Sequence, residues 1–350
     1  MSFRQIPLAI KKEIRPNLEI AAVIPVENGN ILLKYEGSPM LSKLDEQLEV
    51  LWTKDFGLRS KNYVYADVSA HPNGTLYGIT ESDNFRLMTP SGGTLFTYEH
   101  DDWPPFMGAN CFFAGRWVLF IIPTPTGDKL LQLDLETLGI AARYDLEGDQ
   151  EYRYTFTATP DPGIIFIDAA AGQDDAHLFI ITIQKDGRLD IAEATQCLDR
   201  IVGNFSPDGQ SFVMAPHYDE GIEIYSFPAI TRIAGLPQET LFAGRNEYPC
   251  EDEDTIDYTV LFLNDQLLIS LTRFGRLLLI DRATMACTGE LLLEGNEIIA
   301  YDQGGKPVTG DADILDYSGE VGDVIVVPAG LLAVHSSGSL RLYGMEGIGG

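Results

Sequence analysis

The chain is poor in cysteine and in long apolar runs. Its 350 residues include four cysteines, Cys111, Cys197, Cys250 and Cys287, and none is spaced as in the CxxC motif of a zinc or redox site. This predicts unpaired buried thiols in a reducing compartment. No segment approaches the roughly 18 apolar residues of a membrane span, and residues 1–12 lack the apolar stretch of a signal peptide. We therefore expect a soluble, cytoplasmic protein.

Cations are also scarce. The 24 Lys and Arg face 52 Asp and Glu, which gives a net charge of −28. This balance argues against a nucleic acid partner, because phosphate recognition needs a basic surface, and against binding to anionic membranes. Three explanations of the acidic charge remain: it attracts a basic protein partner, it binds a cation, or it only keeps the protein soluble.

The sequence motifs of common catalytic sites are missing as well. No GxGxxG follows an expected strand, and the chain has no P-loop lysine motif, no GxSxG elbow and no HExxH. No cysteine has the basic surroundings that lower a thiol pKa and make a nucleophile. We therefore expect no cofactor, and the absence of these motifs argues against an enzyme.

Short turns recur along the chain. The clearest is Pro207-Asp208-Gly209, where proline fixes φ, aspartate bonds its own backbone and glycine accepts a positive φ, as a β-hairpin requires. Comparable turns lie at 27–30, 71–75, 113–116, 160–163, 207–210, 263–266 and 327–330. The first five recur at intervals of about 41 to 48 residues, the length of a four-stranded propeller blade.

A near-continuous apolar run follows each turn, as at 31–35, 117–121 and 267–271, which predicts strands buried on both faces. The sequence therefore predicts an all-β fold, a seven-bladed β-propeller forming one domain over residues 1–350. The expected blades span about 18–53, 64–98, 109–145, 154–193, 200–236, 256–293 and 323–343. The last blade has only three strands of its own. Because an open strand edge favours aggregation, we expect the N-terminal strand 3–10 to complete that blade as its outermost strand and close the ring.

The Ser-Pro-Asp-Gly turn at 206–209, the His-Pro-Asn-Gly turn at 71–74, Leu-x-Leu-Asp before a threonine, and the repeat length together resemble the WD40-like β-propellers. The resemblance covers nearly the whole chain and is specific to architecture. The Gly-His and Trp-Asp dipeptides of that family are absent from their usual places. The resemblance implies a platform fold whose members mostly bind proteins or peptides, with some enzymes among looser relatives.

Acidic residues concentrate in the loops between blades and in the loops between second and third strands. Such loops share one face in this topology. They contribute Glu99, Asp101, Asp102, Glu251, Asp252, Glu253 and Asp254, with Glu81 and Asp83 from inside a blade. Two interpretations stay open: a solvated rim, or an electrostatic surface that attracts a basic partner.

An apolar cluster interrupts this acidic sequence. Trp103, Phe106 and Met107 follow Asp101 and Asp102 directly. Exposed aromatic residues rimmed by charge are typical of interface anchors, whereas an indole folded back over the blade edge would belong to the core. The sequence thus predicts a non-catalytic platform for protein–protein interactions. It would bind a partner with a basic segment through these residues and 251–254, as a monomer or as a subunit of a larger complex.

Two further functions remain open. His217, His335, Asp168 and Asp175 fall near the ends of second strands or in the loops that follow them. They could hold a divalent metal at the mouth of a central channel, for a lactonase-like or esterase-like hydrolase. Alternatively, the blades serve as a scaffold within an assembly, and the acids only keep the protein in solution.

Overall fold

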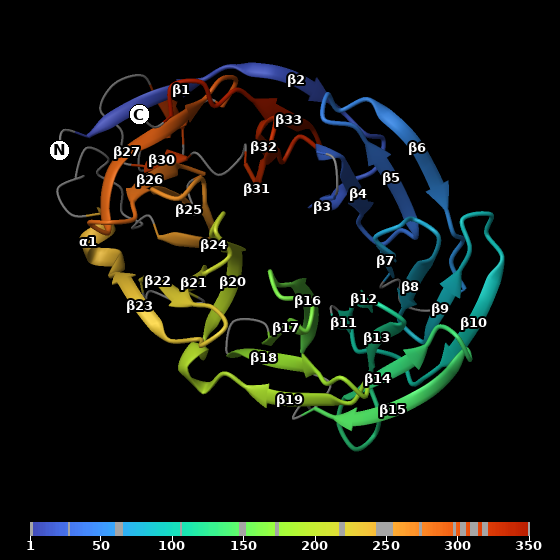
Figure 1. Cartoon of the computed structure of the whole chain (residues 1–350). Coiled ribbons are helices and arrows are strands. Elements are labelled where there is room, and N and C mark those ends of the chain that lie inside the picture. The colour runs from blue at the N-terminus through green and yellow to red at the C-terminus, as the bar shows by residue number, and fades with distance from the viewer. Residues whose placement is uncertain are drawn as a thin grey trace. The chain divides into compact units, whose positions relative to one another are not determined.

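The computed structural model describes residues 3–26, 29–59, 66–105, 107–146, 152–171, 175–216, 221–242, 255–272, 275–296, 299–301, 306–308, 314–316 and 321–348. Nearly all regular structure in these ranges is β-strand, and the fold is the all-β, seven-bladed β-propeller that the sequence predicts (Figure 1). Backbone contacts divide the chain into two compact units, one of Leu18–Leu198 and one of Met1–Asn17 with Asp199–Gly350.

The unit Leu18–Leu198 holds four blades among its described residues, and successive strands of each blade pair antiparallel. The blades comprise β3 (Ile20–Pro25), β4 (Ile31–Tyr35), β5 (Met40–Leu44) and β6 (Val50–Asp55); β7 (Ala66–Ala70), β8 (Tyr77–Glu81), β9 (Asn84–Met88) and β10 (Thr94–Glu99); β12 (Cys111–Ala114), β13 (Trp117–Ile122), β14 (Lys129–Asp134) and β15 (Gly139–Asp145); and β16 (Arg153–Ala158), β17 (Ile164–Ala171), β18 (Asp175–Ile183) and β19 (Leu189–Glu193). The short β11 (Gly108–Ala109) adds to β16 in parallel.

The other unit holds three blades among its described residues. They comprise β20 (Arg200–Phe205), β21 (Ser211–Pro216), β22 (Ile222–Ser226) and β23 (Arg232–Leu236); β24 (Ile256–Phe262), β25 (Leu267–Thr272), β26 (Leu277–Asp281) and β27 (Ala286–Leu293); and β31 (Asp323–Val327), β32 (Gly330–Val334) and β33 (Leu340–Tyr343). The insertion before β24 contains the short helix α1 (Gln238–Phe242). The insertion before β31 contains a small sheet of β28 (Ile299–Tyr301), β29 (Pro307–Val308) and β30 (Ile314–Asp316).

The N-terminal segment forms two strands rather than one. β2 (Ile10–Ile14) pairs antiparallel with β33, from Ile10 opposite Tyr343 to Ile14 opposite Leu340, so it is the outermost strand of the last blade. β1 (Arg4–Leu8) instead runs parallel to β27 of the preceding blade. The assignment of 3–10 as the completing strand is therefore wrong in its bounds: those residues mainly form a fifth strand on a neighbouring blade.

The hairpin between β20 and β21 shows why the turn residues recur. The hydroxyl of Ser206 donates to Asp208 Oδ1 at 2.6 Å, and the amide of Gln210 donates to the same oxygen at 3.0 Å. Gly209 has φ 68°, in the left-handed region that glycine tolerates best. Asp208 is thus a structural turn residue that fixes the direction in which β21 leaves.

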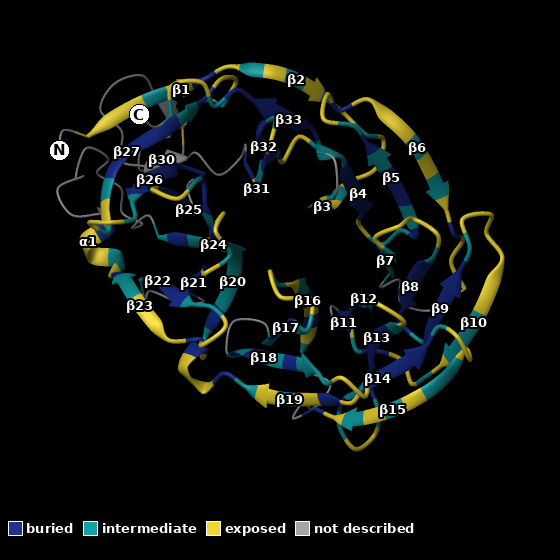
Figure 2. Ribbon diagram, in the orientation of Figure 1, coloured by how far each residue is buried: buried dark blue, intermediate teal, exposed yellow. Residues whose placement is uncertain are grey.

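Burial follows the order of strands within each blade. β4, β8, β9, β21 and β25 are buried at every position. The fourth strands β6, β10, β15 and β23 are largely exposed or half-buried (Figure 2). This confirms that the continuous apolar runs are strands covered on both faces.

Buried ion pairs tie polar residues into these blades. The guanidinium Nε of Arg276 donates to Glu290 Oε1 at 2.9 Å, and both side chains are almost completely buried. Arg86 pairs with Glu81 in the same way at 3.1 Å. Within the described residues, no helix is long and apolar enough to cross a membrane, and Cys111, Cys197 and Cys287 are not in disulfides. Cys250 lies outside the described residues.

Candidate functional site

The loop after β10 is held firmly against its own blade. The amide of His100 donates to Asp83 O at 2.9 Å, and the amide of Trp103 donates to Ser82 O at 2.7 Å. His100 Nδ1 lies 2.7 Å from Asp101 O, and the amide of Met107 donates to Pro104 O. These hydrogen bonds fix the backbone of residues 100–103 against Ser82 and Asp83 of the second blade.

Trp103 is a core residue. Its side chain is 3% exposed and packs with Tyr154, Leu119 and Ile121 in the hydrophobic core of the third and fourth blades. Met107 is half-buried and packs against the same core. The hypothesis that Trp103 is an exposed anchor is wrong, because a side chain so far removed from solvent cannot reach a partner. Its role is to fix the loop.

The acids of this loop have the opposite environment. Glu99, Asp101 and Asp102 are all exposed, and none forms an ion pair with a Lys or Arg in the part of the chain that the structure describes. Burial lowers the pKa of His100 even though Asp101, Asp83 and Asp102 act to raise it, so His100 is neutral at pH 7 and leaves the acids uncompensated. We call Glu99, Asp101 and Asp102 the acidic loop.

The remaining candidates fare differently. Glu81, grouped with the surface acids by sequence, is completely buried against Arg86. Phe106, His217 and the run Glu251, Asp252, Glu253 and Asp254 lie outside the described residues, so their contributions stay predictions. Of the acidic surface expected from sequence, the described part brings together the acidic loop and the half-buried Asp83.

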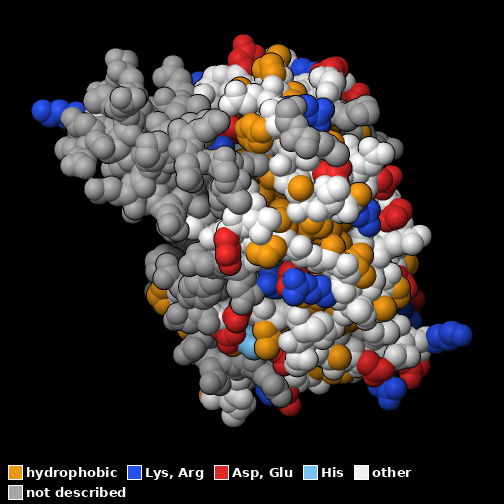
Figure 3. All heavy atoms as spheres, turned by 90° about the vertical axis from the view of Figure 1, so that its left-hand side faces the viewer, with side chains coloured by type: hydrophobic (Ala, Val, Ile, Leu, Met, Phe, Trp, Pro, Cys, Tyr) orange, Lys and Arg blue, Asp and Glu red, His pale blue; other side chains and the backbone are white. Residues whose placement is uncertain are grey.

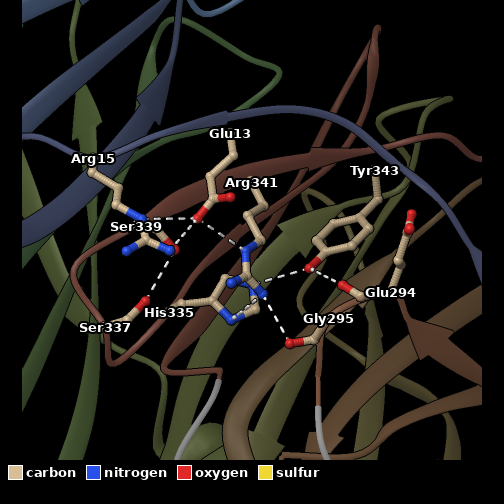
Figure 4. Close-up of polar contacts among 9 residues, drawn as sticks. All are labelled: Glu13, Arg15, Glu294, Gly295, His335, Ser337, Ser339, Arg341 and Tyr343. Carbon is tan, nitrogen blue, oxygen red and sulfur yellow. Dashed lines mark hydrogen bonds and ion pairs between the residues drawn. The ribbon is translucent and has the colours of Figure 1, made fainter.

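His335 lies in a buried polar cluster rather than at an open site (Figure 4). Its Nε2 is 3.1 Å from the Tyr343 hydroxyl, which donates to Glu294 O at 3.2 Å. Its Nδ1 is 3.5 Å from Arg341 Nη1. The network fits a neutral imidazole with the proton on Nε2, so both ring nitrogens have hydrogen-bond partners within the protein.

The same cluster joins three segments that are distant in sequence. Arg341 Nη1 donates to Gly295 O at 3.2 Å, and Arg341 Nε lies 3.5 Å from Glu13 Oε1 (Figure 4). Glu13 belongs to β2, Gly295 opens the long insertion after β27, and Arg341 belongs to β33. The cluster therefore fastens the N-terminal strand and the base of the insertion to the last blade, which is a structural role.

Asp168 and Asp175 lie on paired strands but are not opposite one another, since Asp175 faces Ala171. Asp168 is half-buried within β17, opposite Thr155 and Leu178. Asp175 Oδ2 accepts hydrogen bonds from His177 Nε2 at 2.7 Å and from the Tyr152 hydroxyl at 3.0 Å. Among the described residues, no group of three His, Cys, Asp or Glu is arranged to hold a metal ion.

His177 was missed by sequence reasoning. Its Nδ1 donates to Glu193 Oε1 at 2.6 Å while Nε2 binds Asp175, so the ring lies between two carboxylates. Burial acts against the charged ring, but the hydrogen bonds to Glu193 and Asp175 outweigh it and raise the pKa of His177. Asp175 and His177 are two residues apart on one strand, so their side chains lie on the same face of the sheet. This Asp-x-His spacing is the sequence signal that could have identified the cluster.

Comparison with known proteins identifies no family, so any assignment of function has to start from the propeller architecture. No protein-family model matches the chain, and no curated protein shows significant similarity to it. The propeller fold is compatible with a protein-interaction platform, and propellers also include enzymes, so function must be argued from the described residues.

Proposed function

We propose that this protein is a non-catalytic interaction platform that binds a basic segment of a partner protein at the acidic loop. One observation carries the proposal: Glu99, Asp101 and Asp102 are exposed and unpaired on a loop that the buried Trp103 holds in place. Unpaired charges of one sign on an ordered loop attract an opposite charge without first breaking internal ion pairs.

The net charge of −28 supports the same kind of partner. A field of this sign accelerates the approach of a cationic segment, and salt screens it over about 8–10 Å at ordinary ionic strength. The half-buried Asp83, whose carbonyl accepts from His100, adds a fourth carboxylate close to the loop. In this proposal the carboxylates of the acidic loop bind the partner by charge. Trp103 does not contact the partner and instead holds the loop in position.

A charge-matched comparison tests this function. Asp101→Asn with Asp102→Asn raises the net charge by two, as does Glu46→Lys in the exposed turn between β5 and β6. The probe is a labelled peptide, Lys-Ser-Lys-Ser-Lys, titrated at 50 and 300 mM salt. Exposed charge pairs contribute about 0.2–1 kcal/mol each, so the double variant should weaken binding about fivefold at low salt.

The control Glu46→Lys should change the Kd less than twofold. Equal weakening by both variants would mean that the peptide senses only total charge, and the acidic loop would then be no site. A Kd that does not depend on salt would contradict the electrostatic mechanism.

A further inference from the structure

The fifth and sixth blades enclose a groove whose lining residues are distinct from those of the acidic loop. It has a volume of about 520 Å³ and is lined by Ile224, Ile233, Ala234, Asp265, Asp281 and Arg282, among others. Ile224 comes from β22, and Ile233 and Ala234 come from β23. In the sixth blade, Asp265 lies in the turn before β25, Asp281 is the last residue of β26, and Arg282 follows it. Figure 3 shows hydrophobic side chains reaching the surface beside charged ones on the face that carries β1, β23 and β27.

The wall formed by β23 is apolar and open to solvent. Ile233 is 55% exposed, and Ala234 beside it is half-buried over the core of these two blades. A single exposed isoleucine needs no explanation. Here Ile233 borders a groove whose inner wall is Ile224, which is 1% exposed, so the apolar surface continues from the rim to the interior. A branched aliphatic side chain placed in the groove would cover that surface.

The opposite wall carries negative charge. Asp265 is exposed, and its carboxylate has no hydrogen-bond or ion-pair partner among the described residues. Asp281 Oδ1 accepts from the hydroxyl and the amide of Thr284, which lower the pKa of Asp281 and keep it ionised. The carboxylates of Asp265 and Asp281 thus both border the groove.

Arg282 adds one positive charge to the lining of the groove, and neutral partners hold its side chain in place. Its Nη2 donates to Ser211 Oγ at 2.9 Å, and its guanidinium lies 5.0 Å from the centre of the Phe262 ring. Its charge also acts on Asp208, whose pKa is lowered first by Ser206 and Gln210 and further by Arg282. Among the charged residues of the lining, two acids, Asp265 and Asp281, therefore outnumber the one arginine.

We propose that this groove binds an extended segment of a partner protein in which an aliphatic side chain is flanked by Lys or Arg. The aliphatic side chain would lie against Ile233 and Ile224, and the flanking cations would lie near Asp265 and Asp281. This surface is separate from the acidic loop and requires an apolar contact that the loop does not offer.

Three labelled peptides distinguish the two surfaces. Lys-Leu-Lys-Leu-Lys carries both features, Lys-Ser-Lys-Ser-Lys carries only the charge, and Glu-Leu-Glu-Leu-Glu carries only the apolar side chains. Titrated against the full-length protein at 150 mM salt, the first should bind about tenfold more tightly than either of the others. Asp101→Asn with Asp102→Asn should change the affinity for Lys-Leu-Lys-Leu-Lys less than about twofold, so a failure of the acidic-loop function does not affect the outcome.

Variants then locate the contact. Ile233→Ser should weaken binding of Lys-Leu-Lys-Leu-Lys about tenfold, and Asp265→Asn about threefold. Val50→Ser is the matched control, because Val50 is 58% exposed on β6, the outer strand of another blade; it should have no effect. Ile233→Ser and Asp265→Asn change exposed residues, and an unchanged melting temperature would show that both variants are folded.

Any of three results would overturn the proposal. The first is equal affinity for the leucine and serine peptides, including no measurable binding of either. The second is tighter binding of the glutamate peptide. The third is concentration-dependent self-association, measured by sedimentation, that Ile233→Ser abolishes, since the groove would then be occupied by a second copy of the chain.

Discussion

The indole of Trp103 packs against the phenol ring of Tyr154 with 6.2 Å between the ring centroids and 52° between the ring planes. Tyr154 is itself 1% exposed, and its hydroxyl donates to Asp128 Oδ2 at 2.7 Å. The loop that follows the second blade is therefore attached to the first strand of the fourth. A residue that the sequence places in an acidic loop thus holds two blades together.

Replacing Trp103 should consequently affect stability. Trp103→Ala removes a 3% exposed indole from a packed core, and we expect the free energy of unfolding to fall by about 3–5 kcal/mol. Urea denaturation followed by circular dichroism measures the change. Trp103→Phe should lose clearly less, because it keeps a ring in the site. A Trp103→Ala protein as stable as the wild type would show that the indole is not buried.

The N-terminal strands should contribute unequally. Deleting residues 1–9 removes β1 and the buried Leu8 but leaves β2 on β33, and should cost at least about 2 kcal/mol. Deleting residues 1–14 also exposes the edge of β33 and breaks the Glu13–Arg341 contact, so the melting temperature should fall further and aggregation should increase. Differential scanning calorimetry with light scattering compares the two. Equal melting temperatures would contradict the pairing of β2 with β33.

The Arg276–Glu290 pair should behave as a buried ion pair. Glu290→Gln leaves the guanidinium buried without its counter-charge, and we expect a loss of about 3–5 kcal/mol. The double variant Arg276→Met with Glu290→Leu removes both charges and should lie within about 1 kcal/mol of the wild type. Urea denaturation of the single and double variants gives the comparison. Additive losses in the double variant would mean that the two side chains do not interact.

The His177 cluster should make stability depend on pH. The pKa of His177 is raised in the folded protein, so its contribution is complete below the unfolded value of about 6.5 and is lost as pH rises through the folded pKa. The pKa of Asp175 is lowered, so its own contribution is lost only in acid, as pH falls through the folded pKa.

His177→Gln should therefore cost about 1.5–3 kcal/mol at pH 6, the range for hydrogen bonds to charged groups, and much less at pH 9. Unfolding measured at both values tests this. Glu193→Gln should lower the pKa of His177 in an NMR titration, and an unchanged titration curve would show that Glu193 is not its partner.

The parts of the fold that follow from local chemistry could be predicted from sequence. Turn residues such as Pro207, Asp208 and Gly209 determine a hairpin through contacts within a few positions of sequence. Continuous apolar runs indicate strands that are buried on both faces. These two signals were sufficient for the propeller class. An N-terminal strand does complete the last blade, but its bounds differ from the expected 3–10. Residues 4–8 instead pair in parallel with β27, and no turn connects these two strands to mark the register.

The candidate site was less predictable because its decisive contacts are long-range. Trp103 stands among Asp101, Asp102 and two prolines, a polar context that predicts exposure, yet its environment comes from Leu119 and Tyr154 in other blades. Glu81 looks like a loop acid until Arg86 is placed against it. The groove beside Ile233 depends on two blades meeting, which no single repeat reveals.

The positions of β1 and β2 impose an order on the synthesis of the protein. Residues 4–14 leave the ribosome long before Gly289–Leu293 and Leu340–Tyr343, the strands with which they pair. The contact between Ile10 and Glu294 closes a loop of 284 residues. During translation the first strands must therefore wait unpaired, with Leu8 and Ile10 uncovered, while the other blades form. Residues 4–14 are consequently exposed to mispairing and to chaperones until the last blade emerges.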